Sequence, residues 1–186
     1  SHPFQKIDEL WLADIGENIA DKTYISNVIP KINQRNSNKE ALCLGIAFWA
    51  HIKTLLDFDE KNISQLSSYD ECVNFYTNHF YKLDGAIRKL YAEFLTQKEL
   101  IVPIQEYYKN LSTQFLHKWF KYIDEYNSNQ KGKIADILNE HNTKTAIVVG
   151  DGVSFEFSKD IISKITNRDY KLTEEFLFAG LPSETM

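Results

Sequence analysis

A carboxylate and two hydroxyl groups near the end of the chain have the types and spacing for metal-assisted phosphoryl transfer. Asp151 follows the apolar run Ala146-Ile-Val-Val149, and Ser183 and Thr185 follow the run Phe176-Leu-Phe-Ala179. A carboxylate suits Zn²⁺, Mg²⁺ or Mn²⁺. A metal ion can also lower the pKa of a hydroxyl group, which then acts as a nucleophile at neutral pH. These residues therefore predict half of a phosphoryl-transfer site.

Each of these features also has a simpler structural interpretation. Asp151 lies between Gly150 and Gly152, and a turn aspartate often bonds its own backbone. Ser183 and Thr185 could only cap a helix. The residue pattern leaves both alternatives open.

Other parts of the chain offer no second set of metal ligands. No two of the histidines after His2 have the spacing of three or four residues that builds a metal site on a helix. These histidines are His51, His79, His117 and His141. Asp57, Asp59 and Glu60 could bind a cation weakly, but a solvated helix end explains them more simply. The sequence contains no P-loop, dinucleotide fingerprint or Ser-His-Asp set.

The elements that precede this region are predicted to be helical. Apolar residues recur every three or four positions, which is typical of amphipathic helices. The predicted helices cover residues 4–20, 22–34, 39–57, 70–96, 103–126 and 133–141. Pro30 is expected to break the second helix, and Asn38 or Ser37 to cap the third. Residues 1–143 are therefore expected to form a helical bundle domain.

Two of these helices have a clear pattern. Residues 4–20 place one apolar stripe on a face, comprising Ile7, Leu10, Trp11, Ile15 and Ile19. Residues 70–96 carry a heptad-like seam of Val73, Tyr76, Phe80, Leu83, Ile87, Leu90 and Phe94. Both sets are expected to face the core.

The apolar pattern changes at Thr145. Residues 146–149 and 176–179 are short apolar runs that predict strands, and Ser154 can cap a helix that continues to about residue 166. A strand, a helix and a second strand predict a parallel βαβ unit with a right-handed crossover. Residues 144–186 would therefore begin an α/β domain. Its strands should be covered, so we expect Val148, Phe176 and Phe178 to be buried.

Four segments resemble one known family. Ile147-Val-Val-Gly-Asp-Gly-Val-Ser-Phe-Glu-Phe157 resembles the first strand and loop of the PglZ domain, and Gly180-Leu-Pro-Ser-Glu-Thr185 resembles its Pro-Ser-x-Thr segment. The helical stretches around residues 81–91 and 115–120 are similar to the region that precedes this domain in phosphatase-like proteins of BREX phage-defence systems. On this resemblance, the chain is a fragment with the helical region and the start of a PglZ domain.

The resemblance implies a function. PglZ domains belong to the alkaline phosphatase superfamily, so Asp151 corresponds to the first metal-ligating aspartate and Thr185 to the nucleophile that also contacts a metal. The parent protein would then use zinc or manganese to hydrolyse a phosphate ester or a nucleic-acid phosphodiester. Gly150, Gly152 and Phe155 depart from the usual aromatic and arginine choices. Because one carboxylate and one hydroxyl leave a metal under-coordinated, we expect no bound metal and no turnover in this chain by itself.

A second hypothesis needs no chemistry. The helical bundle could be a protein-interaction module that docks other subunits of a defence complex, and exposed strands could pair two copies into a homodimer. A net charge of −5 argues against general attraction to nucleic acid or to an anionic membrane. No apolar run reaches the roughly 20 residues that span a bilayer. Cys43 and Cys72 have the setting of free thiols in a reducing compartment, so we expect a cytoplasmic protein.

Overall fold

The computed structural model divides the chain into two compact units, Ser1–Lys121 and Tyr122–Met186. It describes residues 2–128, 132–140, 146, 148, 150, 152–165 and 172–178. The division after Lys121 comes earlier in the chain than the sequence-based boundary at residue 143. Each unit is considered separately below.

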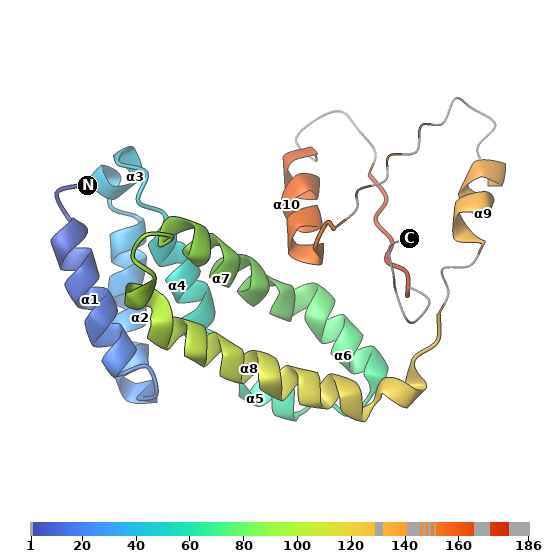
Figure 1. Cartoon of the computed structure of the whole chain (residues 1–186), viewed down its shortest axis with the longest axis horizontal. Coiled ribbons are helices and arrows are strands. Elements are labelled where there is room, and N and C mark those ends of the chain that lie inside the picture. Colours follow the sequence, from blue (N-terminus) through green and yellow to red (C-terminus); the bar gives the residue numbers. More distant parts are fainter. Residues whose placement is uncertain are drawn as a thin grey trace. The chain divides into compact units, whose positions relative to one another are not determined.

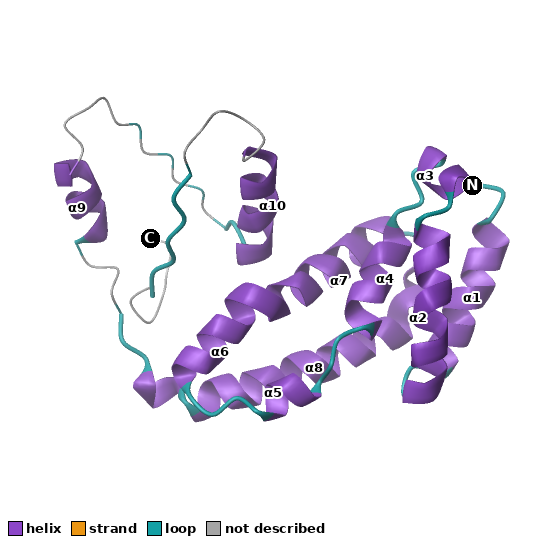
Figure 2. Ribbon diagram, turned by 180° about the vertical axis from the view of Figure 1, so that it is seen from behind, coloured by secondary structure: helices purple, strands orange, loops and turns teal. Residues whose placement is uncertain are grey.

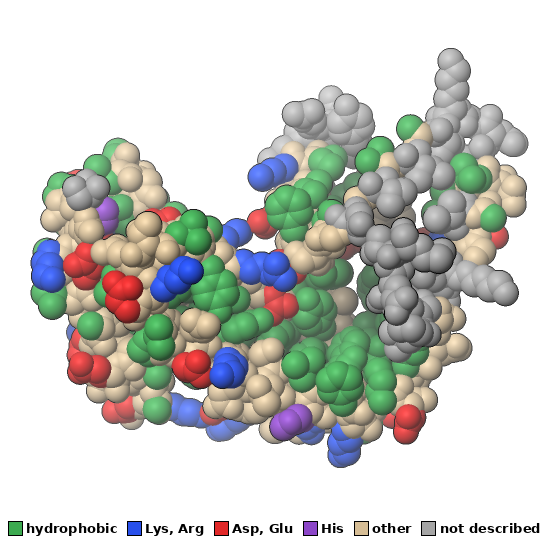
Figure 3. All heavy atoms as spheres, in the orientation of Figure 1, with side chains coloured by type: hydrophobic (Ala, Val, Ile, Leu, Met, Phe, Trp, Pro, Cys, Tyr) green, Lys and Arg blue, Asp and Glu red, His purple; other side chains and the backbone are tan. Residues whose placement is uncertain are grey.

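The first unit consists of helices joined by short loops (Figure 1). They are α1 (Gln5–Glu17), α2 (Lys22–Asn36), α3 (Lys39–Cys43), α4 (Phe48–Leu56), α5 (Lys61–Ser64), α6 (Tyr69–Phe75), the π-helix η1 (Tyr76–Phe80), α7 (Tyr81–Glu93), the 3₁₀ helix η2 (Lys98–Ile101) and α8 (Val102–Lys121). Helices α6, η1 and α7 follow one another without a break, and α8 runs back beside them (Figures 1 and 2). On the face in Figure 3, hydrophobic side chains gather at the end of this unit where α6 begins and α8 ends, and elsewhere they are interspersed with charged ones.

The predicted seam of α6 to α7 is confirmed. Six of its seven members are buried: Val73, Phe80, Leu83, Ile87, Leu90 and Phe94. Helix α7 packs its part of the seam against α4, whose buried residues include Trp49, Ile52 and Leu55. Burying large apolar side chains of this kind contributes roughly 1.5–3 kcal/mol each.

The closest ion pair of the core joins α1 to α2. Asp8 is only 3% exposed, and its two carboxylate oxygens accept from Arg35 Nη2 at 2.7 Å and Nε at 3.1 Å. The indole Nε1 of Trp49, on α4, donates to the same carboxylate at 3.1 Å. The Arg35 guanidinium also lies 4.7 Å from the centre of the Phe4 ring. One buried carboxylate therefore connects three helices.

Helix α1 buries only part of the predicted stripe. Ile15 is buried and the Trp11 ring centre lies 4.4 Å from that of Trp49, whereas Ile7 and Leu10 are 63% and 62% exposed. Gly16 is also buried, and a Cβ there would lie 2.8 Å from Pro103 Cγ, so α1 approaches the start of α8 closely. The prediction was wrong for Ile7 and Leu10, and it left out Asp8, which is buried through its pairing with Arg35.

One predicted helix break is absent, and one break that the sequence analysis did not predict is present. Helix α2 continues through Pro30. The proline removes the helical hydrogen bond to the carbonyl of Ser26, but Ser26 is exposed, so water can take the place of the missing donor. The predicted helix over 39–57 is instead two helices. Gly45 has a φ of 70°, and Ile46 N donates to Ala41 O at 2.9 Å, so a glycine-terminated motif ends α3. Asn38 caps α3 as expected, since its Oδ1 accepts from Ala41 N.

Helices α7 and α8 share a second carboxylate. Asp84 accepts hydrogen bonds from the hydroxyl groups of Tyr76 at 2.9 Å and Tyr108 at 2.7 Å. Burial raises the pKa of Tyr108, and its hydrogen bond to Asp84 adds to the effect. Tyr108 is therefore held in the protonated, hydrogen-donating form.

The second unit contains η3 (Ile123–Glu125), α9 (Lys133–Glu140) and α10 (Phe155–Ile165). No described residue of the chain belongs to a strand (Figure 2). The prediction of a βαβ unit, which would begin an α/β domain in residues 144–186, is therefore wrong for the described part of the chain. Val148 is 91% exposed and Phe176 is 52% exposed, so neither is the buried strand residue that we expected.

A short apolar run becomes a strand only when a partner strand satisfies its backbone groups. In residues 172–178, Phe178 instead makes two contacts that involve side chains. Its carbonyl oxygen accepts a hydrogen bond from Ser128 Oγ, and its ring meets the ring of Tyr126 edge to face. The exposed strands proposed for pairing two copies are likewise missing from the described residues. Among these residues, no helix has the length and hydrophobicity needed to cross a membrane.

Breaking the buried pair should destabilise the first unit strongly. Asp8→Ala leaves the Arg35 guanidinium without its carboxylate, which costs about 3–5 kcal/mol for a buried pair. Urea unfolding followed by tryptophan fluorescence measures the change. The matched control is Lys6→Ala, which removes the exposed Lys6–Glu9 bridge and should cost less than about 1 kcal/mol. Equal losses for the two variants would contradict the role of Asp8.

Stability should also fall at alkaline pH, partly through Tyr108. Its folded pKa is raised above the usual value of about 10, so the unfolded chain ionises first and stability is lost as pH rises above about 10. Tyr108→Phe should lower the free energy of unfolding by about 1 kcal/mol at neutral pH and reduce the alkaline loss. Tyr81→Phe, outside the Asp84 cluster, is the control. An unchanged alkaline slope in Tyr108→Phe would contradict this assignment.

Candidate functional site

The predicted phosphoryl-transfer residues lie outside the described part of the chain. Asp151, Ser183 and Thr185 are among the residues whose placement is not described. Their proximity and coordination therefore stay predictions. The described residues next to Asp151 still define the local backbone.

Two described glycines, Gly150 and Gly152, flank Asp151 in the sequence. Gly152 has a φ of 67°, in the left-handed region that glycine favours. A Cβ at Gly150 would lie 2.9 Å from Val153 Cγ2. The backbone conformation therefore favours glycine at 152, and the nearby Val153 side chain favours it at 150.

A helix begins shortly after these glycines. Helix α10 starts at Phe155, and Ser158 N donates to Ser154 O at 3.0 Å, so the predicted helix from Ser154 is confirmed. Glu156 lies in its first turn and is 7% exposed. Lys159 pairs with Glu174 and lies 5.1 Å from the centre of the Phe155 ring. The Ser-aromatic-Glu segment is therefore a helix start.

The described residues contain no group of three or more His, Cys, Asp or Glu side chains that could hold a metal ion. Asp57 accepts from Lys53 Nζ at 2.6 Å, and Glu60 accepts from Lys22 Nζ at 2.6 Å. The weak cation site considered around Asp57, Asp59 and Glu60 is thus a set of carboxylates with separate partners. Asp59 accepts from the backbone N of Lys61 at 3.1 Å.

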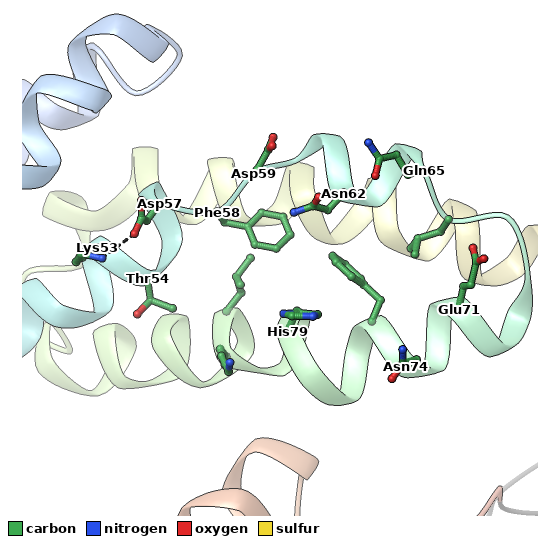
Figure 4. A pocket seen from close by; sticks show the side chains of 14 residues that line it. Lys53, Thr54, Asp57, Phe58, Asp59, Asn62, Gln65, Glu71, Asn74 and His79 are labelled. Carbon is green, nitrogen blue, oxygen red and sulfur yellow. Dashed lines mark hydrogen bonds and ion pairs between the residues drawn. The ribbon is translucent and has the colours of Figure 1, made fainter.

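The first unit has an open groove of about 880 Å³ between the α4–α5 segment and α6 to α7 (Figure 4). Its apolar lining includes Phe58, Phe75 and Leu83. Figure 4 shows Asn62 and Gln65 on one wall and Asn74 and His79 on the other. Amides, an imidazole and aromatic rings can hold a ligand. The lining also includes the charged pair Lys53–Asp57 and the hydroxyl group of Thr54.

A π-helix turn forms part of this groove wall. The π-helix η1, Tyr76–Phe80, separates α6 from α7 and contains His79, whose ring centre lies 5.7 Å from that of Phe75. Single π turns within helices are frequent at functional sites. Sequence reasoning missed the groove residues Phe58, Asn62 and His79, because no local pattern distinguishes a groove side chain from an ordinary surface one.

Comparison of the chain with models of known protein families, with curated proteins and with solved structures finds no match.

Proposed function

We propose that the chain is part of a PglZ-type metal-dependent phosphatase or phosphodiesterase that acts in bacterial anti-phage defence of the BREX type. The sequence basis is two motifs in the family's order, one around Asp151 and one that contains Thr185. The observation that supports it best is helix α10, which begins shortly after Gly150 and Gly152.

The two residues have distinct proposed roles. Asp151 supplies a carboxylate ligand, and the Thr185 hydroxyl attacks phosphorus. A divalent metal, zinc or manganese, supplies charge stabilisation when bound. One carboxylate and one hydroxyl are too few donors for a two-metal site. Further ligands would therefore come from other parts of a complete PglZ domain, and the chain by itself should bind no metal tightly.

Phosphoryl transfer is tested in a protein that contains this chain within a complete PglZ domain. Thr185→Ala should lower hydrolysis of p-nitrophenyl phosphate and bis-p-nitrophenyl phosphate by about 100-fold or more, because it removes the nucleophile. Asp151→Asn should also lower the bound zinc or manganese, measured by elemental analysis. Thr173→Ala and Asp136→Asn are matched controls that remove an exposed hydroxyl and an exposed carboxylate, and they should leave activity within about twofold.

Two results would overturn the proposal. The first is the absence of stoichiometric divalent metal from the complete protein. The second is full phage defence by a Thr185→Ala, Asp151→Asn double variant, which would instead support a non-enzymatic interaction module. Lost defence with retained assembly of the defence complex supports the enzymatic role.

A further inference from the structure

A second cavity of the first unit has apolar walls and an acidic rim. It has a volume of about 670 Å³ and lies between the α1–α2 turn, the end of α4 and α8. Its apolar lining includes Ile19, Ile25, Ile29, Leu56, Pro103 and Tyr107. A cavity of this size with mainly apolar walls can enclose one or two side chains of a partner.

The cavity lining carries more carboxylates than ammonium groups. Four carboxylates line it, against the ammonium group of Lys22. Two of the four also pair with lysines outside the lining, Asp57 with Lys53 and Glu106 with Lys109. The carboxylates belong to Asp57, Asp59, Glu60 and Glu106. An acidic rim with low-dielectric walls attracts cations and repels phosphate groups. The charge therefore favours a basic peptide over a nucleic acid or an anionic lipid.

Lys22 already shows how a cation binds at this rim. Its Nζ lies 2.6 Å from Glu60 Oε1, although the two residues are 38 positions apart in sequence. The hydrogen bond to Glu60 raises the pKa of Lys22. The Lys22 side chain is 74% exposed and that of Glu60 is 35% exposed. Because exposed pairs contribute only about 0–1 kcal/mol, an incoming cation can replace Lys22 at little cost.

The cavity wall also offers a hydroxyl group beside this carboxylate. Burial raises the pKa of Tyr107, and the nearby Glu60 carboxylate raises it further. Tyr107 therefore keeps its proton at neutral pH and can donate a hydrogen bond to a peptide carbonyl. Glu60 and Tyr107 together provide an acceptor for a cation and a donor for a backbone.

We propose that this cavity binds a peptide segment of a partner protein in which a basic residue stands beside an apolar anchor. The anchor fills the space between Ile25, Leu56 and Tyr107, and the basic side chain takes the place of Lys22 at Glu60. The site is independent of the phosphoryl-transfer proposal, because it uses none of that proposal's residues.

The test titrates two capped pentapeptides into the complete 186-residue chain, followed by backbone amide NMR shifts. The peptides are Gly-Leu-Arg-Leu-Gly and Gly-Leu-Glu-Leu-Gly. The arginine peptide should give saturable shifts at the cavity residues, and the glutamate peptide should not. Lys22→Ala should tighten binding about two- to fivefold by removing the internal competitor, and Glu60→Gln should weaken it about tenfold.

The two substitutions therefore change the Kd in opposite directions, which a general loss of structure would not do. Lys6→Ala, on α1, is the matched control for loss of an exposed lysine and should leave the Kd unchanged. The proposal is overturned by equal shifts with both peptides, by weaker binding in Lys22→Ala, or by shifts confined to residues outside the cavity. Saturable binding of a short oligonucleotide at the same residues would also overturn it.

Discussion

The first unit depends on one buried carboxylate. Asp8 is enclosed by the Arg35 guanidinium and the Trp49 indole, so its charge and its hydrogen-bonding capacity are satisfied inside the core. A buried pair of this kind contributes little compared with apolar packing, but it is costly to break from one side. It therefore fixes the mutual position of α1, α2 and α4 more than it adds stability.

The position of α4 determines where the binding surfaces form. Asp57, Phe58 and Asp59 follow the end of α4 and line both cavities of the first unit. Phe58 packs near Phe75 and Phe80, with ring centres about 6 Å away. A short segment between α4 and α5 thus separates an amide-walled groove from an acid-rimmed cavity. Both surfaces combine apolar and polar side chains, which suits them to bind a ligand.

The sequence-based predictions were most accurate for features that depend on residues close together in the chain. The seam from Val73 to Phe94 follows a regular period, Asn38 stands directly before the helix that it caps, and α10 begins after Ser154. Gly45 was a local signal that was overlooked, because the apolar run around it suggested one continuous helix.

Features that depend on distant partners could not be read in this way. Asp8 is buried because it pairs with Arg35, and that partner lies 27 residues away in the sequence. The π turn of η1 was not predicted, because it leaves the spacing of the apolar seam residues almost unchanged. The apolar runs at 146–149 and 176–179 suggested strands, but a strand forms only with a partner strand. For the candidate phosphoryl-transfer site, the sequence supplied the residue types and the structure describes only the adjoining glycines and helix.

A double-mutant cycle on Asp8 and Arg35 tests most directly whether their pair holds the first unit together. The free energies of unfolding would be measured for the unmodified chain, Asp8→Ala, Arg35→Ala and the double variant. If the pair acts as one unit, the double variant should lose less than the sum of the single losses, with a coupling energy of about 2 kcal/mol or more. Losses that add to within about 0.5 kcal/mol would contradict this account.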